Sequence, residues 1–174
     1  EVMRILSENG VESAIISLGG NVQALGTKTD GSNWRVAVQS PDDTEDYLGV
    51  LSIRDKAVIT SGGYERYFEQ DGKTYQHILD PKTGYPADSG LTSVTIVSAD
   101  GTLADGLSTS LFVMGKEKAV AYWRAHSEEF DAILVEKDGT VSVTENIADQ
   151  FTPDDVRLED YVTGPQIKNI PVAV

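Results

Sequence analysis

Short strand-forming runs separated by two-residue turn signals constrain the fold of this chain more than any other feature. The clearest signal is Asp71-Gly72, which lies between residues 64–70 and residues 73–79. Asp-Gly readily adopts the positive φ angles of a tight hairpin turn, so these two runs are expected to pair as antiparallel strands. A second Asp-Gly pair, at residues 138–139, predicts another hairpin. The chain therefore favours antiparallel sheet.

The N-terminal third contains further runs of strand length. Residues 13–18 (SAIISL) form a largely apolar run of strand length, and the tight turn Gly19-Gly20 follows them. We expect residues 13–18, 22–27 and 34–39 to be the consecutive strands of a meander, with an acidic loop at residues 41–46. The other expected strands are residues 47–53, 57–61, 64–70, 73–79, 91–98, 132–136 and 140–144.

Helical patterns lie between and after these strands. Residues 102–114 place apolar side chains at helical spacing and end at Gly115, a suitable C-cap. Residues 116–125 predict a second helix, and residues 145–174 are interpreted as a short helix and a tail. The predicted fold class is therefore α+β, a mostly antiparallel sheet with a few helices packed against it.

The chain begins at Glu1 directly inside a helical pattern, which Asn9-Gly10 ends. We interpret residues 1–174 as the C-terminal portion of a single domain whose N-terminal part is missing.

Composition restricts the partners and the chemistry. The chain carries 28 Asp and Glu residues against 14 Lys and Arg, a net charge of -14, and such a surface repels nucleic-acid phosphates. It has no cysteine, so cysteine nucleophiles and thiolate zinc sites are excluded. A metal would need oxygen ligands or one of the two histidines. No apolar run approaches the roughly 20 residues that a membrane-spanning helix needs.

Asp105 and Thr109 stand four residues apart in the predicted helix 102–114, so their side chains share one face. A carboxylate beside a hydroxyl could hold Mg²⁺, which takes its other ligands from water, backbone or substrate phosphate. The alternative is an ordinary solvated helix face, or a Thr hydroxyl that bonds back to a helix carbonyl.

His77 ends a predicted strand just before the turn at residues 79–84. An imidazole there could act as a general base or hold a phosphate. The alternative is a half-buried histidine that bonds to the loop backbone. His126 ends the helix 116–125, and the favourable helix C-terminus explains it, so we assign it no role.

Two further places could contact an anion. The backbone at Gly19 and Gly20 is free of side-chain obstruction, although the same pair suits a plain hairpin turn. Arg66 would also be a useful contact if it faced inward, which strand alternation alone does not decide.

Four motifs follow one another along the chain: LGGN (residues 18–21), TSGGYER (60–66), HILDPKTGYP (77–86) and ADGLST (104–109). Together they resemble the ApbE-type flavin transferases, and HILDPKTGYP is the most specific of the four. The resemblance implies an ApbE-like, T-fold-like architecture. It also implies a Mg²⁺-dependent FAD:protein FMN transferase, which passes the FMN moiety of FAD to a Thr or Ser hydroxyl of a target protein and releases AMP. Related members instead hydrolyse FAD to FMN and AMP.

Carried over position by position, the resemblance assigns Asp105 and Thr109 to the metal, Leu79 to FAD through its backbone, and His77 to the edge of the active site. We add Gly19, Gly20 and Arg66 as candidate FAD-binding residues. Some relatives carry Asp where this chain has Ser108, and a hydroxyl is a poorer Mg²⁺ ligand.

A pyrophosphate can approach so acidic a chain only if a divalent ion reverses the local charge. We rank His77 first as the base for the incoming hydroxyl, because Asp105 would lose basicity on the metal. The rival functions are an FAD pyrophosphatase and a flavin-binding module without turnover.

The resemblance further implies a lipid anchor on the missing N-terminal segment and a location on the extracytoplasmic side of the bacterial cytoplasmic membrane. We also expect the isolated fragment to bind FAD weakly, to turn it over negligibly and to self-associate, because contacts of the missing part are lost and apolar surface is exposed.

Overall fold

The computed structural model describes residues 1–43, 45–154 and 168–170. Its α-helices are α1 (Val2–Glu8), α2 (Gly101–Met114) and α3 (Lys116–Ala125), and a 3-10 helix, η1, spans Glu145–Gln150. The strands are β1 (Ala14–Leu18), β2 (Asn21–Leu25), β3 (Trp34–Gln39), β4 (Tyr47–Ile53), β5 (Ala57–Gly62), β6 (Tyr67–Gln70), β7 (Lys73–Gln76), β8 (Leu91–Ser98), β9 (Asp131–Glu136), β10 (Val141–Thr144), β11 (Phe151–Pro153) and β12 (Lys168–Ile170). None of the helices in these residues is long and apolar enough to cross a membrane.

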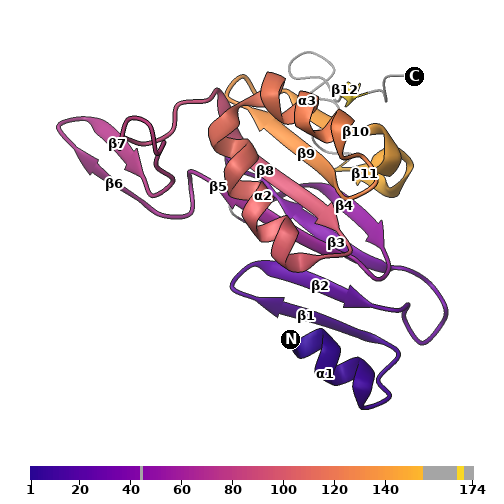
Figure 1. Ribbon diagram of the computed structural model, residues 1–174. Helices are drawn as coiled ribbons and strands as arrows, with labels where there is room; N and C mark the ends of the chain where they lie inside the picture. The colour runs from indigo at the N-terminus through magenta and orange to yellow at the C-terminus, as the bar shows by residue number, and fades with distance from the viewer. Residues whose placement is uncertain (44, 155–167, 171–174) are drawn as a thin grey trace.

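The described strands form one large sheet, one small sheet and a separate hairpin. The large sheet has the order β1-β2-β5-β8-β9-β10-β12, the small sheet the order β11-β4-β3, and β6 pairs with β7. Every pair is antiparallel except β10 with β12. Helices α2 and α3 cover one face of the large sheet, and the small sheet covers the other (Figure 1). The predicted α+β class is confirmed.

Strand alternation builds two cores, one on each face of the large sheet. On β8, Ile96 points toward α2 and α3, whereas the next residue, Val97, points toward the small sheet. Leu111 and Trp123 complete the helix-side core, and both are almost fully buried. β5, between β2 and β8, follows the same alternation, so the side of the strand that carries Ala57, Ile59 and Ser61 faces α2.

The predicted meander is right for its first two strands, since β1 pairs with β2, and wrong for the third. β2 pairs with β5, whereas β3 pairs with β4 in the other sheet. The chain turns away after β2 at Gly26, whose φ is +58°, and a Cβ there would lie 2.0 Å from the carbonyl oxygen of Glu12. A run of apolar residues shows that a strand forms but carries no information about its partner.

The predicted C-terminal tail also needs correction. η1 is the expected short helix, but β11 follows it and pairs with β4. This pairing requires Gly49, because a Cβ on it would lie 2.6 Å from both the Phe151 ring and the Thr152 carbonyl oxygen. β12 lies further along, and the rest of the predicted tail falls outside the described residues.

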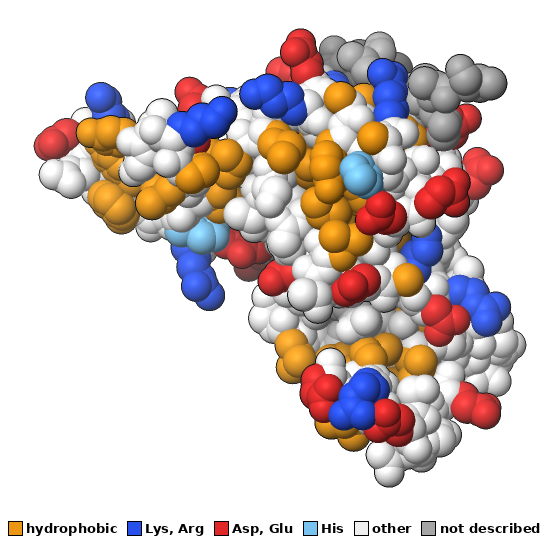
Figure 2. Space-filling model, in the orientation of Figure 1, with side chains coloured by type: hydrophobic (Ala, Val, Ile, Leu, Met, Phe, Trp, Pro, Cys, Tyr) orange, Lys and Arg blue, Asp and Glu red, His pale blue; other side chains and the backbone are white. Residues whose placement is uncertain are grey.

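The β6–β7 hairpin extends away from the two sheets (Figure 1). Asp71 and Gly72 adopt the positive φ angles expected of its turn, +52° and +70°. Phe68 stacks on Tyr75 across the strands with ring centroids 5.1 Å apart, yet Phe68 remains 59% exposed. Hydrophobic side chains gather on this projection in Figure 2. Both strands are shorter than predicted, since His77 and Leu79 belong to the loop that follows.

Asp131, at the start of β9, is a buried carboxylate whose polar contacts offset only part of the cost of burying its charge. It is 4% exposed, accepts a hydrogen bond from Thr144 Oγ1 at 3.0 Å, and has Lys56 Nζ 3.8 Å away. Burial raises the pKa of Asp131, and the hydrogen bond and Lys56 offset only part of that effect. Because the pKa is raised in the folded state, the folded chain binds this proton more tightly than the unfolded chain does. Protonated Asp131 therefore contributes to the free energy of unfolding at low pH, and this contribution is lost as pH rises through the folded-state pKa.

We predict that Asp131→Asn becomes more stable relative to wild type as pH rises from about 4 to about 7, because Asn cannot ionise. Urea unfolding at each pH gives the free-energy difference between the two chains. Asp88→Asn is the matched control: Lys137 lowers the pKa of that exposed carboxyl, so its trend should have the opposite sign and lie mostly below about pH 4. A difference for Asp131→Asn that does not change with pH contradicts the prediction.

Candidate functional site

Helix α2 presents the two predicted metal ligands side by side. The helix begins after Asp100, whose carboxylate accepts N–H bonds from Thr102 and Leu103 at 2.8 and 3.2 Å. Its buried face consists of Ala104, Leu107, Ser108, Leu111 and Phe112. Asp105 and Thr109 therefore remain exposed, one turn apart, where α2 packs on β5.

Two strands bring further polar groups to this pair. Asn21, the first residue of β2, donates from Nδ2 to Asp105 Oδ1 at 3.1 Å. Ser61, near the end of β5, has its Oγ 2.9 Å from Thr109 Oγ1 and 2.8 Å from Ser108 Oγ. Sequence reasoning did not assign either residue to the site. The signal that could have found them is their position inside the LGGN and TSGGYER motifs.

The oxygen ligands of this site fit a hard divalent cation. Asp105 Oδ1 accepts one hydrogen bond, and no described residue donates to Oδ2. The described residues contain no group of three His, Cys, Asp or Glu side chains that could hold a metal. A single carboxylate and a hydroxyl match Mg²⁺ rather than a metal bound entirely by protein, because Mg²⁺ keeps several waters and takes substrate phosphate oxygens as ligands.

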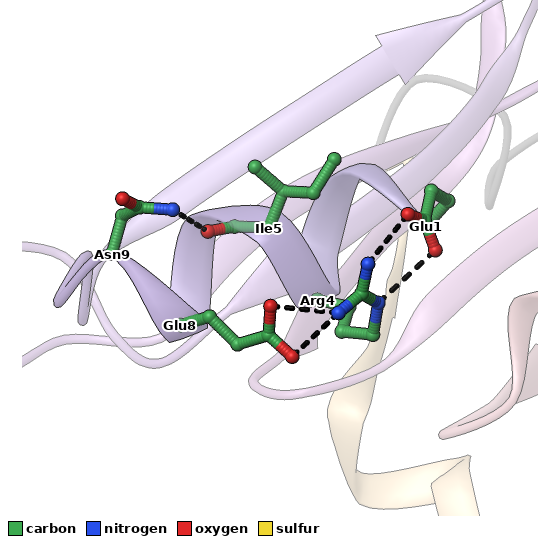
Figure 3. Close-up of polar contacts among 5 residues, drawn as sticks. All are labelled: Glu1, Arg4, Ile5, Glu8 and Asn9. Atoms are coloured by element: carbon green, nitrogen blue, oxygen red, sulfur yellow. Dashed lines mark hydrogen bonds and ion pairs between the residues drawn. The ribbon is translucent and has the colours of Figure 1, made fainter.

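A cavity of about 730 Å³ adjoins Asp105. Glu1, Arg4, Asn21 and Asp100 are among the residues that line it. The Arg4 guanidinium is already engaged, since it binds Glu1 and Glu8 at 2.6 Å each on helix α1 (Figure 3). The side chains around Asp105 therefore offer little free positive charge to an anionic ligand.

His77 lies in the segment after β7. Its Nδ1 is 3.2 Å from the carbonyl oxygen of Arg66, and its backbone N–H donates to the same oxygen at 3.0 Å. A carbonyl can only accept, so Nδ1 must carry a proton to make this bond, and in the neutral ring Nε2 is then the nitrogen with the lone pair. This tautomer suits a base. No hydrogen bond in the described chain joins His77 to Asp105 or Thr109.

The HILDPKTGYP segment is an ordered loop. Asp80 accepts N–H bonds from Lys82 through its side chain and from Gly84 through its carbonyl oxygen, at 2.9 and 2.8 Å. Leu79 and Pro86 form a bridge across it. Leu79, predicted to contact FAD through its backbone, leaves its side chain 52% exposed.

The other candidate residues have simpler surroundings. Gly19 and Gly20 form the β1–β2 turn with φ of +59° and +88°, which fits the hairpin alternative. Arg66 is exposed and makes no ion pair within the described residues. His126 caps α3 and stacks on Tyr122 with ring centroids 4.3 Å apart, consistent with a structural position.

The two glycines of TSGGYER leave room for neighbouring side chains. A Cβ on Gly62 would lie 2.2 Å from the Tyr64 ring, and one on Gly63 would lie 2.0 Å from Gln76 Oε1. Larger residues would push Tyr64 and Gln76 away, so this motif fixes the end of β5 where Ser61 lies.

Comparison with known proteins decides the family. The model of the ApbE family matches residues 1–134. The chain belongs to the ApbE family. Among curated ApbE-like relatives, the chain is 43% identical to an FAD:protein FMN transferase of Klebsiella pneumoniae (strain 342), over 85% of this chain and 45% of that protein. It is 38% identical to one of Treponema pallidum, over 91% of this chain and 46% of that protein.

Solved ApbE structures have the same fold. The ApbE protein of Thermotoga maritima superposes with a TM-score of 0.77 and 36% identity, over 86% of this chain and 48% of that chain. The flavinyl transferase ApbE of Pseudomonas stutzeri superposes with a TM-score of 0.70 and 35% identity, over 86% of this chain and 47% of that chain. The chain thus spans less than half the length of these ApbE relatives, and its fold is ApbE-like, as expected.

We predict that Asp105→Asn weakens Mn²⁺ binding by more than about tenfold, because it removes the carboxylate charge while keeping its shape. Electron paramagnetic resonance of free Mn²⁺, with and without FAD, measures the affinity. Asp71→Asn is the control: it removes the same charge at a positive-φ turn position that Asn tolerates. An equal loss of Mn²⁺ affinity in both variants, or no loss in Asp105→Asn, contradicts the assignment of Asp105 as a metal ligand.

Proposed function

We propose that this chain supplies the metal-binding portion of an FAD:protein FMN transferase. The reaction is the Mg²⁺-dependent transfer of the FMN moiety of FAD to a Thr or Ser hydroxyl of a target protein, with release of AMP. The observation that carries the proposal is the exposed Asp105–Thr109 pair on α2, with Ser61 and Asn21 bonded behind it. The names of the ApbE relatives support the choice of FAD and of transfer.

Charge explains why a metal belongs in this reaction. The chain has a net charge of -14, and Arg4, which lines the same cavity as Asp105, is paired with two glutamates. A pyrophosphate therefore needs another positive charge. When bound, Mg²⁺ would neutralise the phosphate oxygens and polarise the phosphorus. Asp105 and Thr109 would hold the ion in position against the pyrophosphate.

The remaining step is the transfer itself. The hydroxyl oxygen of the target bonds to the phosphorus of the FMN half, the pyrophosphate P–O bond breaks, and AMP leaves. The hydroxyl proton must go to a base, and His77 Nε2 is the candidate because its lone pair is unengaged. The FAD contacts at Leu79, Gly19, Gly20 and Arg66 stay predictions.

Two alternatives share this site. With water as the acceptor, the same residues would make an FAD pyrophosphatase that yields FMN and AMP. Without turnover, the chain would be a flavin-binding module. A lipid anchor, an extracytoplasmic location and self-association of the chain also stay predictions, and the exposed aromatic residues of the β6–β7 hairpin support the last of these.

The test incubates the natural protein at full length with FAD, Mg²⁺ and a Thr-containing target peptide, and follows AMP and peptide mass. We predict AMP together with a flavinylated peptide, and negligible turnover by residues 1–174 alone. Asp105→Ala should lower the rate of AMP release by about a hundredfold or more, because the metal contributes several kcal/mol. AMP with unmodified peptide identifies the pyrophosphatase, FAD binding without AMP identifies the module, and a wild-type rate in Asp105→Ala removes the metal from the mechanism.

His77→Asn tests the base separately. We predict a rate about 10²- to 10⁴-fold lower with FAD affinity little changed, since Asn can keep a hydrogen bond to the Arg66 carbonyl but cannot take a proton. Steady-state rates and flavin fluorescence titration give the two quantities. Weaker FAD binding at an unchanged maximal rate would make His77 a binding residue instead.

A further inference from the structure

Four oxygen atoms at the α2–β5 contact form a connected set. Ser108 Oγ donates to the backbone carbonyl oxygen of Asp105 at 2.9 Å. Ser61 Oγ lies 2.8 Å from Ser108 Oγ and 2.9 Å from Thr109 Oγ1. The set therefore runs from Thr109 on α2 to Ser61 on β5, back to Ser108 on α2, and ends at the carbonyl oxygen of Asp105, one helical turn before Thr109.

The direction of these hydrogen bonds follows from counting protons. Each hydroxyl has one proton to donate, and a carbonyl oxygen can only accept. Ser108 donates its proton to the Asp105 carbonyl oxygen, so in the bond between the two serines Ser61 is the donor. Because Ser61 has no second proton to donate, Thr109 is the donor in the bond between Thr109 and Ser61.

This direction decides what Thr109 can bind. Its proton points to Ser61, so neither lone pair of Oγ1 is used in that bond, and Thr109 lies exposed one helical turn after Asp105. A cation needs such lone pairs and is repelled by a hydroxyl proton. A bound cation would in turn make the Thr109 hydroxyl a stronger donor and strengthen its bond to Ser61.

We propose that Ser61 is a positioning residue of the metal site, acting with Ser108 as a hydrogen-bond relay that holds Thr109 as a neutral alcohol ligand. Ser108, which is fully buried, thus serves as a link in the relay rather than as a direct ligand. The inference rests on the proposed function only through the metal assignment of Asp105 and Thr109.

The opposite face of β5 offers a matched control. Thr60 and Thr95 place their hydroxyl oxygens 2.8 Å apart, so Thr60 also makes a hydroxyl–hydroxyl bond in the same strand. Strand alternation points Thr60 away from α2, toward the small sheet. Thr60→Val therefore removes one comparable hydrogen bond without touching the relay.

The experiment measures Mn²⁺ affinity by electron paramagnetic resonance for wild type, Ser61→Ala, Ser61→Thr and Thr60→Val. We expect Ser61→Ala to lower Mn²⁺ affinity about tenfold, the lower end of the range for residues that hydrogen-bond to a metal ligand. Ser61→Thr keeps a hydroxyl and should recover most of the affinity, and Thr60→Val should bind as wild type does. Loss of affinity in Thr60→Val equal to that in Ser61→Ala overturns the relay, because general destabilisation would then explain both.

A metal-free measurement tests the hydrogen bond itself. A double-mutant cycle of Ser61→Ala with Thr109→Val should show a coupling of about two- to tenfold in the unfolding equilibrium constant, the range for one hydrogen bond. No coupling overturns the relay.

The two proposals fail in different ways. If Ser61→Ala binds Mn²⁺ as wild type does while Asp105→Asn loses it, the relay is wrong and the metal site stands. If Asp105→Asn also keeps its affinity, the metal site is wrong, and the proposed function falls with the relay.

Discussion

The packing of α2 across β5 and β8 is the contact on which the rest of the structure depends. Leu107 and Leu111 are buried against the sheet, each worth about 1.5–3 kcal/mol, whereas a single hydroxyl hydrogen bond is worth only about 1 kcal/mol. The apolar contact therefore sets where the helix lies, and the hydroxyls only orient groups within that placement. Ser61 meets Ser108 and Thr109 because Ile59, two residues earlier on the same strand face, belongs to the core that α2 covers.

The electrostatics of the molecule point to the same place. An acidic chain repels a phosphate unless positive charge is supplied locally, and Arg4, which lines the same cavity as Asp105, is already bound to two glutamates. On the proposed function, a divalent ion held by one carboxylate and one alcohol would supply that charge and leave coordination positions for the phosphate. The same arrangement explains why so few protein ligands are gathered here.

Local signals predicted the elements, and long-range packing escaped prediction. The Asp71-Gly72 hairpin and the helix 102–114 follow from turn chemistry and from helical spacing, which neighbouring residues alone determine. The spacing of Asp105 and Thr109 likewise followed from the helix. The β2–β5 pairing and the role of Ser61 did not, because both depend on residues tens of positions away that come together only in the folded chain. The β11 strand was missed for the same reason: its pairing depends on Gly49 on a distant strand.

Our proposal that Asp105 and Thr109 together hold a divalent cation can be tested in the crystal. Its most direct test is anomalous X-ray scattering from crystals of the protein soaked in Mn²⁺. We predict a peak about 2 Å from both a carboxylate oxygen of Asp105 and Oγ1 of Thr109, with the Thr109–Ser61 hydrogen bond retained. A peak that touches neither residue, or no peak when Mn²⁺ is saturating, would contradict it.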